Sequence, residues 1–358
     1  MAVNLARRAE VLKLARLLGV PPEQLGYLHK LDAAVIRKLR RQATASLFDA
    51  DRRSFQKVAA ASKLLPAPVT ALIAEKALGP LLCARIAGLL EPQRAVEIAR
   101  RLDVRYLADL CLELDPRSAE DVLQSMPGER IVEVSRELAR RREYITMARF
   151  VDSLSDAAIE AVMADLRDDE ALLRIGFFVE DAGRLSAIIG LLPPQRLRNI
   201  VRVAADRGGE LWPEALALIN SVDEPQRRLM ADLAAALDDE AVNRMIGATQ
   251  EQGLWPAMLP MVSMMSTEYQ RRLINLPAIQ NEAVLDAIIR AADGMNLWPQ
   301  LLPLVALMDG AGQARALRTA GHQGEAVLAR LAESLQALAP ARKRRQRAEV
   351  GRRHNDSV

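Results

Sequence analysis

Aromatic residues are scarce in this chain: phenylalanine, tryptophan and tyrosine together make up 3% of its 358 residues. Strands favour aromatic and β-branched side chains, whereas alanine, leucine, arginine and glutamate, which are abundant here, favour helices. Half of the residues are apolar, so the chain can bury a sizeable core. We therefore expect an all-α protein.

Groups that carry catalysis or bind metals are also few. The three histidines, His29, His322 and His354, are far apart, and Cys83 and Cys111 are the two cysteines. No Cys/His cluster has the spacing of a metal site, and no glycine-rich loop has the spacing that binds phosphate. The sequence predicts no catalytic residue, no metal site and no cofactor, so we expect a protein that is not an enzyme. Two lone thiols indicate a reducing compartment, and we expect the cytoplasm.

Long uninterrupted apolar runs are missing as well. Charged residues interrupt the first twenty positions, so no secretory signal is predicted. Nowhere do about 18 apolar residues follow one another without a charge or a proline, so no membrane span is predicted.

Every tryptophan of the chain lies in the same three-residue motif. Leu211-Trp212-Pro213 returns as Leu254-Trp255-Pro256 and as Leu297-Trp298-Pro299, at intervals of 43 residues. Proline fits the first turn of a helix, and a large apolar residue before it packs back across the helix start. An aromatic ladder exposed to a ligand is the alternative. The residues that we expect to pack between successive repeats are Trp212, Trp255, Trp298, Pro213, Pro256 and Pro299.

Two further motifs keep nearly the same spacing. A Gln-Arg-Arg motif starts at Gln226 and Gln270 and becomes Gln-Ala-Arg at Gln313, while a Glu-Ala-Val motif starts at Glu240, Glu282 and Glu325. A fixed period of about 40 residues in a chain without strand signals is typical of a helical solenoid. We expect a right-handed superhelical α-solenoid of three-helix, roughly 43-residue repeats, of the armadillo or HEAT kind.

The arginines of the Gln-Arg-Arg motif are the main candidates for partner binding. In a regular solenoid they would line up one repeat apart, and repeated guanidinium groups bind acidic peptides, nucleic-acid backbones or anionic lipids. A solvent-exposed face that pairs with neighbouring Asp and Glu is the alternative. The tentative partner-binding residues are Arg228, Arg272, Arg315, Gln226, Gln270 and Gln313.

Charge and proline divide the chain into three predicted parts. Residues 1–76 carry a net charge of +8 and residues 339–358 of +5, so the segment between them carries −10 within the total of +3. Pro66 and Pro68 mark a joint between helices. We predict a basic helical N-terminal region at 1–66, a solenoid array at 67–339, and a disordered basic tail at 340–358.

Both basic ends offer a second kind of contact. Their charge suits a nucleic-acid backbone or an anionic membrane surface, although no aromatic residues are interleaved to recognise bases. A solubilising role is the alternative. The candidate residues for electrostatic contact are Arg37, Lys38, Arg40, Arg41, Arg342, Lys343, Arg344, Arg345 and Arg347.

The turns between the predicted helices carry a family resemblance. The run from Glu91 to Asp103 and the turns Leu114-Asp115-Pro116 and Met126-Pro127-Gly128-Glu129-Arg130 resemble the cytosolic N-terminal domain of MgtE-type magnesium transporters. They also resemble the related helical repeats of the flagellar rotor switch protein. The likeness covers about residues 85–200 and implies short helices joined in a right-handed superhelix. Neither activity and no magnesium-binding residue is carried over, because the membrane helices, the nucleotide-sensing module and the torque-helix charge pattern have no counterpart in this sequence.

These features predict a non-enzymatic cytoplasmic interaction or scaffold protein that binds a peptide or protein partner on the solenoid surface. The alternative is a binder of nucleic acid or of an anionic membrane surface, through the basic ends and the arginine series. A weaker alternative, an ion-responsive regulatory subunit, rests on the resemblance alone. The sequence leaves open the oligomeric state and whether the N-terminal helices occupy the solenoid groove.

Overall fold

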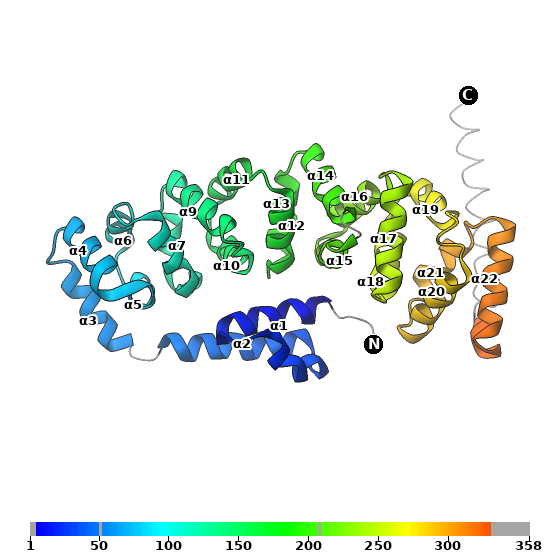
Figure 1. Ribbon diagram of the computed structural model, residues 1–358, viewed down its shortest axis with the longest axis horizontal. Coiled ribbons are helices and arrows are strands. Elements are labelled where there is room, and N and C mark those ends of the chain that lie inside the picture. Colours follow the sequence, from blue (N-terminus) through cyan, green and yellow to red (C-terminus); the bar gives the residue numbers. More distant parts are fainter. Residues whose placement is uncertain (1–4, 50–51, 207–208, 331–358) are drawn as a thin grey trace, which may run out of the picture. The chain divides into compact units, whose positions relative to one another are not determined.

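The chain is helical throughout the residues that the structure describes. The structure is a computed structural model and describes residues 5–49, 52–206 and 209–330. No strand occurs in these ranges, so the prediction of an all-α protein is confirmed. Two compact units divide between Ile200 and Val201, and each is described by itself below (Figure 1).

The first unit holds many short helices, the last of which runs across the division. Its elements are α1 (Leu5–Leu18), η1 (Pro22–Lys30), α2 (Ala33–Asp49), α3 (Arg52–Ser62), α4 (Ala67–Ile73), η2 (Ala74–Leu78), α5 (Gly79–Ala87), α6 (Pro92–Ala99), α7 (Val104–Glu113), η3 (Pro116–Ala119), α8 (Glu120–Gln124), α9 (Gly128–Arg140), α10 (Tyr144–Phe150), η4 (Val151–Ser153), α11 (Asp156–Asp165), α12 (Asp169–Phe178), α13 (Ala182–Leu191) and α14 (Pro194–Ala205).

Local capping explains where many of these helices begin. The side chains of Asp103, Asp168 and Asp181 accept backbone N–H groups in the first turns of α7, α12 and α13. Pro92 occupies the first turn of α6, where a missing N–H costs nothing. Each aspartate satisfies a donor that the helix itself leaves unpaired, so these starts follow from the sequence alone.

From α4 to α13, most helices of the first unit pack on the second helix ahead. Examples are α5 on α7, α7 on α9, α9 on α11 and α10 on α12. Their shared core is made mainly of alanine, leucine, valine and isoleucine. This is the packing order of helix pairs and gives no support to a three-helix period over residues 67–200.

In the second unit, helices pack on the second helix ahead, as α16 does on α18 and α20 on α22, and also on the third, so the three-helix repeat stays a prediction. In this unit α15 packs on α18, α16 on α19, and α18 on α21. Its N-cap residues also recur at 43-residue spacing, at Asp223, Ser266 and Asp309 and again at Asp238 and Asn281. The elements are α15 (Trp212–Ser221), α16 (Glu224–Ala235), α17 (Asp239–Glu251), α18 (Trp255–Met264), α19 (Thr267–Ile274), α20 (Glu282–Gly294), α21 (Trp298–Val305) and α22 (Gly310–His322).

All three tryptophans are buried in the second unit. Trp212 is fully buried, and its indole N–H donates to the hydroxyl of Thr249 on α17 at 2.8 Å. The indole of Trp255 donates to Gln250 at 2.7 Å, and Trp298 is also buried. The following prolines occupy the first turns of α15, α18 and α21. An exposed aromatic ladder is therefore excluded.

Among the described residues one stretch, Ala67–Ala87, is long and apolar enough to cross a membrane by length and composition alone. Three charged residues and two prolines interrupt it, which is why the sequence did not predict a span there. The stretch is two helical segments, because Gly79 leaves the helical conformation with φ 73° and ψ 167°. After this break α5 packs back against η2, and neither segment has the roughly 20 residues of a spanning helix.

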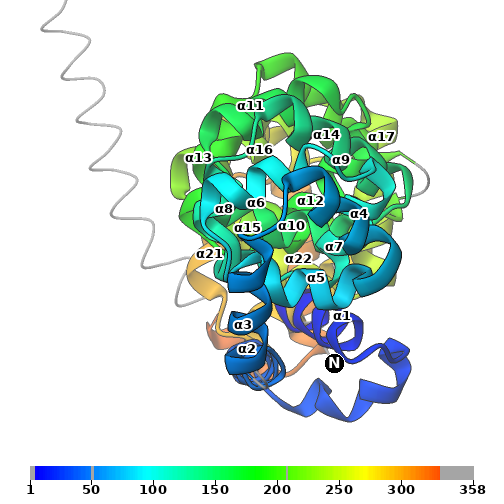
Figure 2. The ribbon, with the colours of Figure 1, turned by 90° about the vertical axis from the view of Figure 1, so that its left-hand side faces the viewer.

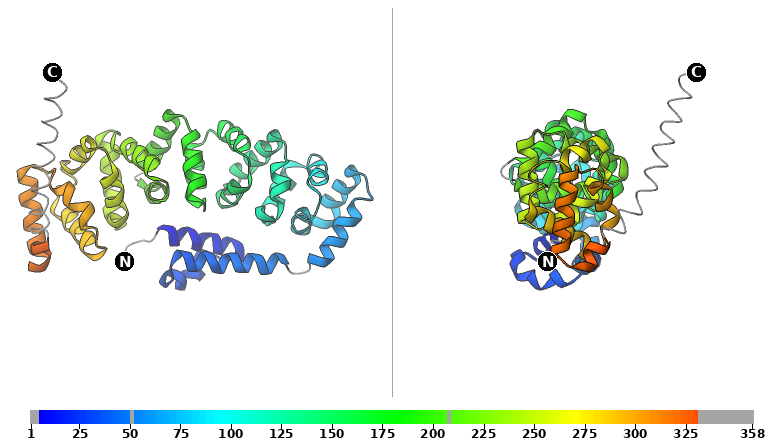
Figure 3. Two further views of the ribbon diagram at one scale, coloured as in Figure 1. Left: turned by 180° about the vertical axis from the view of Figure 1, so that it is seen from behind. Right: turned by 90° about the vertical axis from the view of Figure 1, so that its right-hand side faces the viewer.

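The helices α1, η1 and α2 form a small region with a core of its own. Leu14, Ala15, Leu25, Leu28 and Ile36 make one buried cluster within it. Figures 1 and 3 show α1 and α2, in blue, running alongside other helices of the same unit. The predicted boundary near residue 66 stays a prediction, because the structure divides the chain elsewhere.

Candidate functional site

Glu10 and Lys13 lie one turn apart on α1, and both are buried. A buried charge is costly unless it is paired, and the two side chains form an ion pair at 3.1 Å. On α2, the buried Arg40 donates to Glu10 through Nε and a terminal nitrogen, at 3.2 and 3.1 Å. Arg37, one turn earlier, adds a further contact at 3.1 Å. One carboxylate therefore joins α1 to α2.

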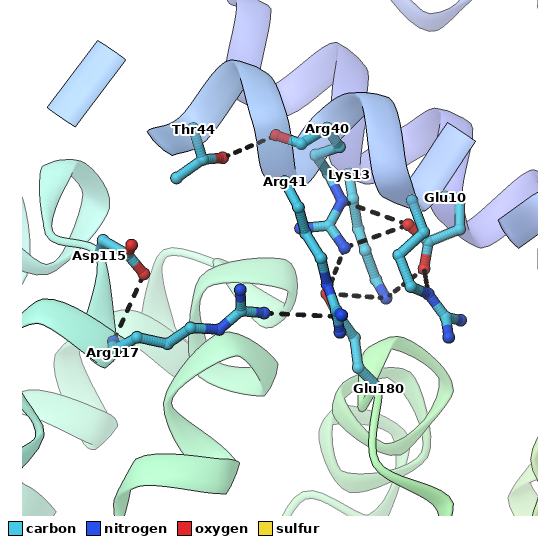
Figure 4. A network of polar contacts seen from close by, with 9 residues as sticks. Glu10, Lys13, Arg40, Arg41, Thr44, Asp115, Arg117 and Glu180 are labelled. Carbon is cyan, nitrogen blue, oxygen red and sulfur yellow. Dashed lines mark hydrogen bonds and ion pairs between the residues drawn. The ribbon is translucent and has the colours of Figure 1, made fainter. Parts of the chain in front are cut away.

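A second carboxylate comes from the helical array. Glu180 lies between α12 and α13, with its side chain 13% exposed, and forms ion pairs with Arg40 and with Arg41, the latter at 3.0 Å. Lys13 is 3.7 Å from the same carboxylate, and so is Arg117 of η3. Figure 4 shows these side chains converging on Glu180 from α1, α2 and η3. We call Glu10, Lys13, Arg40, Arg41 and Glu180 the charged cluster.

A separate ion pair holds α1 to the array at another point. Arg16, near the end of α1, donates to Glu143 at 3.1 Å, and Glu143 is the residue before α10. The ion pairs at Glu180 and at Glu143 thus both join an acidic residue on the array to basic residues on the N-terminal helices.

Burial and charge act in opposite directions on the pKa values of the charged cluster. Burial lowers the pKa of Lys13 and outweighs its attraction to Glu10 and Glu180. Burial also pushes the pKa of Glu180 upward, but Lys13, Arg40 and Arg41 outweigh it and lower this pKa to about 2. Glu180 is therefore ionised at neutral pH, and cations outnumber carboxylates in the cluster.

The N-terminal basic residues do not form the free cationic surface that the sequence predicts. Arg40 is buried, and Arg37 and Arg41 are paired with Glu10 and Glu180. Lys38 is exposed and forms no ion pair with a described residue. The sequence misses this arrangement because Arg40 and Glu180 are 140 residues apart, and no local spacing signals such a pair.

The second predicted basic surface lies in the predicted tail. These residues, outside the described part of the chain, are Arg342, Lys343, Arg344, Arg345 and Arg347.

The glutamines of the Gln-Arg-Arg motif close turns inside the fold. Gln270 donates to carbonyls at the end of α18 at 3.0 and 3.1 Å, and Gln313 donates to the carbonyl of Met308, after α21, at 3.2 Å. When positions are counted from the leucine before each tryptophan, Arg227 is the first-copy residue that corresponds to Gln270 and Gln313. Arg227 donates to carbonyls at the end of α15 at 2.8 and 3.0 Å. Gln226 lies against the carboxylate of Asp223 instead. The predicted register of the first copy is therefore one residue early.

The arginines of the motif are not one exposed series. Arg272 donates to the carbonyl of Ala235, the last residue of α16, and to that of Leu237, and it pairs with Asp239 at 2.5 Å. Arg315 donates to Gln280, which stands 43 residues after Leu237.

Arg228 differs from both. Its side chain is exposed and forms no ion pair with a described residue. It is also not the repeat equivalent of Arg272, because the residue 43 positions before Arg272 is Leu229. The expectation that three equivalent arginines line up is therefore wrong, and two of them donate to groups elsewhere in the second unit.

This use of arginine recurs through both units. In six places an arginine donates to the carbonyl of a leucine that follows an earlier helix, 28 to 35 residues back. The pairs are Arg94 with Leu65, Arg130 with Leu102, Arg149 with Leu114, Arg184 with Leu154, Arg196 with Leu166, and Arg272 with Leu237. A charged donor thereby satisfies a carbonyl that the end of a helix leaves unpaired.

We expect Arg272→Ala to lower the free energy of unfolding of the second unit by about 1–3 kcal/mol, because the carbonyls of Ala235 and Leu237 lose a charged donor. Arg228→Ala, on an exposed side chain, should change it by less than about 0.5 kcal/mol. Urea unfolding of the two variants measures the difference. Equal effects would contradict the assignment of Arg272 to the fold.

No other cluster of chemically active groups stands out in the described ranges. They contain no group of three or more His, Cys, Asp or Glu side chains placed to hold a metal ion. Burial raises the pKa of Cys83 and of Cys111, the latter to about 12, so neither thiol ionises at neutral pH. A pocket of about 340 Å³ lies between α17 and α20. Two of its polar lining residues are already used by the fold: Gln250 accepts the indole N–H of Trp255, and Asn281 accepts the backbone N–H of Ala283.

Comparison with known proteins does not identify a family: no family model, curated protein or solved structure matches the chain. The resemblance to the transporter domain and the rotor protein therefore stays a prediction. Function has to be argued from the charged cluster and the surfaces of the two units.

Proposed function

We propose that this chain is a non-enzymatic interaction protein whose helical array binds a basic amphipathic helix of a protein partner. In this proposal the helices from about residue 67 onward form a right-handed superhelical solenoid, and the protein works in the cytoplasm. The observation that carries the proposal is the contact at Glu180 and Glu143, where the array binds the chain's own basic helices.

The nature of this contact favours exchange with a partner. The helices α1 and α2 have a buried cluster of their own, and charged side chains link them to the array. The outer links are partly exposed: the side chain of Arg16 is 42% exposed and that of Arg41 is 49% exposed. Each outer link contributes about 0–1 kcal/mol. A partner helix that also supplies cations to Glu180 in place of Lys13 and Arg40 can therefore compete with α1 and α2. The N-terminal helices then act as an internal competitor.

The packing order supports the solenoid part of the proposal. Helices in each unit pack on the second or third helix ahead, and arrays of this kind present long surfaces that suit peptides and helices. Nucleic-acid binding through α2 has less support, because three of its four candidate basic residues are paired with carboxylates.

The test releases α1 and α2 while leaving the array intact. In the full chain, Arg16→Glu with Arg41→Glu reverses the two outer links and leaves Glu143 and Glu180 in place. The probe is a fluorescent peptide with the wild-type sequence of residues 5–49. We expect faster hydrogen exchange over residues 5–49 of the variant, and peptide binding at least about tenfold tighter than to the wild type, because the internal competitor is lost.

The matched control is Lys30→Glu with Lys38→Glu, which makes the same change in charge at exposed positions without described ion pairs. It should behave like the wild type. Adding Glu143→Arg to the released variant should restore the ion pair with residue 16 and weaken binding of the wild-type peptide. A released array that fails to bind the peptide, or a control that matches the released variant, would reject the proposal.

A further inference from the structure

In the helical segment α4–η2 the small apolar side chains face the core and the larger ones face outward, which is the reverse of an ordinary surface helix. Its buried residues are Ala67, Ala71 and Ala74. Its outward side chains are larger: Val69 is 42% exposed, Leu72 is 58% exposed and Ile73 is 38% exposed. A surface helix normally turns its larger apolar side chains to the core. The outer side of α4–η2 is therefore suited to an apolar environment outside the fold.

The exposed apolar face continues onto the neighbouring helices. α3 packs on α5, and α5 packs on η2, at the end of the first unit that Figure 2 faces. Of sixteen large apolar residues that are exposed in the described chain, eight lie between Val58 and Leu82. The others on this end are Val58, Leu64, Leu65, Leu81 and Leu82. Clustering of this kind marks an interaction site, whereas scattered exposed residues do not.

Charge complementarity indicates what covers this face. Residues 52–87 contain six lysines and arginines and one acidic residue, Glu75. The carboxylate of Glu75 is occupied, since it accepts the backbone N–H of Asp103 at 2.6 Å. Lys57 and Lys76 are exposed, and Lys76 continues the outward stripe of Val69 and Leu72 along the helix.

We infer that the surface formed by α3, α4–η2 and α5 docks on an anionic lipid membrane. Its leucine, isoleucine and valine side chains enter the boundary between headgroups and acyl chains, while its lysines meet the anionic headgroups. A second copy of the chain is a poorer occupant, because a symmetric contact would place like charges opposite each other. The break at Gly79 makes the surface an interfacial one that does not span the bilayer. This surface is separate from the charged cluster.

Flotation of the full chain with lipid vesicles tests the inference. One set of vesicles is phosphatidylcholine alone, and the other contains a minor fraction of phosphatidylglycerol. We expect binding to the anionic vesicles only, and a decrease of at least about tenfold for Leu64→Gln with Leu72→Gln and for Lys57→Glu with Lys76→Glu. All four side chains are exposed, so circular dichroism should show an unchanged fold.

Matched controls are Leu229→Gln on α16 and Lys38→Glu on α2, which change exposed residues outside this surface and should leave binding unchanged. The inference is overturned if the wild type does not bind anionic vesicles. Binding that survives both double variants also overturns it, because the lipid contact then lies elsewhere. A wild-type dimer that Leu64→Gln with Leu72→Gln dissociates would make a second copy the occupant.

Discussion

Replacing Glu10 with alanine should destabilise the N-terminal helix pair by about 3–5 kcal/mol, because it leaves buried charges without their partner. Glu10 is 1% exposed and contacts Lys13, Arg37 and Arg40. Without it, Lys13 and Arg40 stay buried and share one carboxylate, that of Glu180. The loss should therefore exceed that of any partly exposed ion pair on α1 or α2.

Hydrogen exchange measures this effect where it occurs. Glu10→Ala should speed exchange across residues 5–49, whereas Glu23→Ala, at an exposed carboxylate of η1, should have little effect. The double variant Glu10→Ala with Lys13→Ala should cost less than the sum of the two single changes, because it removes both members of a buried pair. If Glu10→Ala and Glu23→Ala have the same effect, the charged cluster does not stabilise the helix pair.

The dependence of stability on pH tests the charged cluster independently. The pKa of Glu180 is lowered to about 2, so the folded state binds this proton less readily than the unfolded state. The stabilisation is complete above the ordinary glutamate value of about 4.3 and is lost as the pH falls through the folded pKa; the full difference amounts to about 3 kcal/mol. Glu180→Gln should remove this part of the pH dependence. The charged groups that interact with Glu180 are Lys13, Arg40, Arg41, Arg117 and Asp152.

Local signals in the sequence predict local structure well. Asp103 and Asp168 cap helices because their carboxylates reach N–H groups two or three residues ahead, and this geometry depends on neighbouring residues alone. The 43-residue return of Trp212 likewise predicts where helix starts recur in the second unit, at Asp223, Ser266 and Asp309. No tryptophan marks a repeat in the first unit, where most helices from α4 to α13 pack on the second helix ahead.

Contacts between distant residues could not be predicted in this way. Nothing near Arg40 indicates that its partner is Glu180, and nothing near Leu72 indicates that alanines fill the other side of its helix against the core. The Pro-Gln-Arg turns are an intermediate case. They are visible in the sequence at Arg94 and Arg196, but their role, bonding the carbonyl of a leucine about 30 residues back, requires the structure.

Replacing Trp212 with alanine should lower the free energy of unfolding of the second unit by about 3–5 kcal/mol, since it opens a large cavity in a closed core. Trp212 is 0% exposed, and so is Thr249, which accepts its indole N–H. The Thr249 hydroxyl in turn donates to the carbonyl of Met245 at 2.7 Å. The tryptophan thus joins α15 to α17 by a hydrogen bond as well as by packing.

Phenylalanine separates these two contributions. The indole nitrogen of Trp298 has no hydrogen-bond partner among the described residues, so Trp298→Phe should lose packing alone. Trp212→Phe should lose packing and also a hydrogen bond. In urea unfolding, it should therefore lower the free energy of unfolding by about 1 kcal/mol more than Trp298→Phe does. Thr249→Val should destabilise the wild type but have a smaller effect in the Trp212→Phe background, where no donor is left unpaired. A larger loss for Trp298→Phe than for Trp212→Phe would show that the bond to Thr249 does not distinguish the two sites.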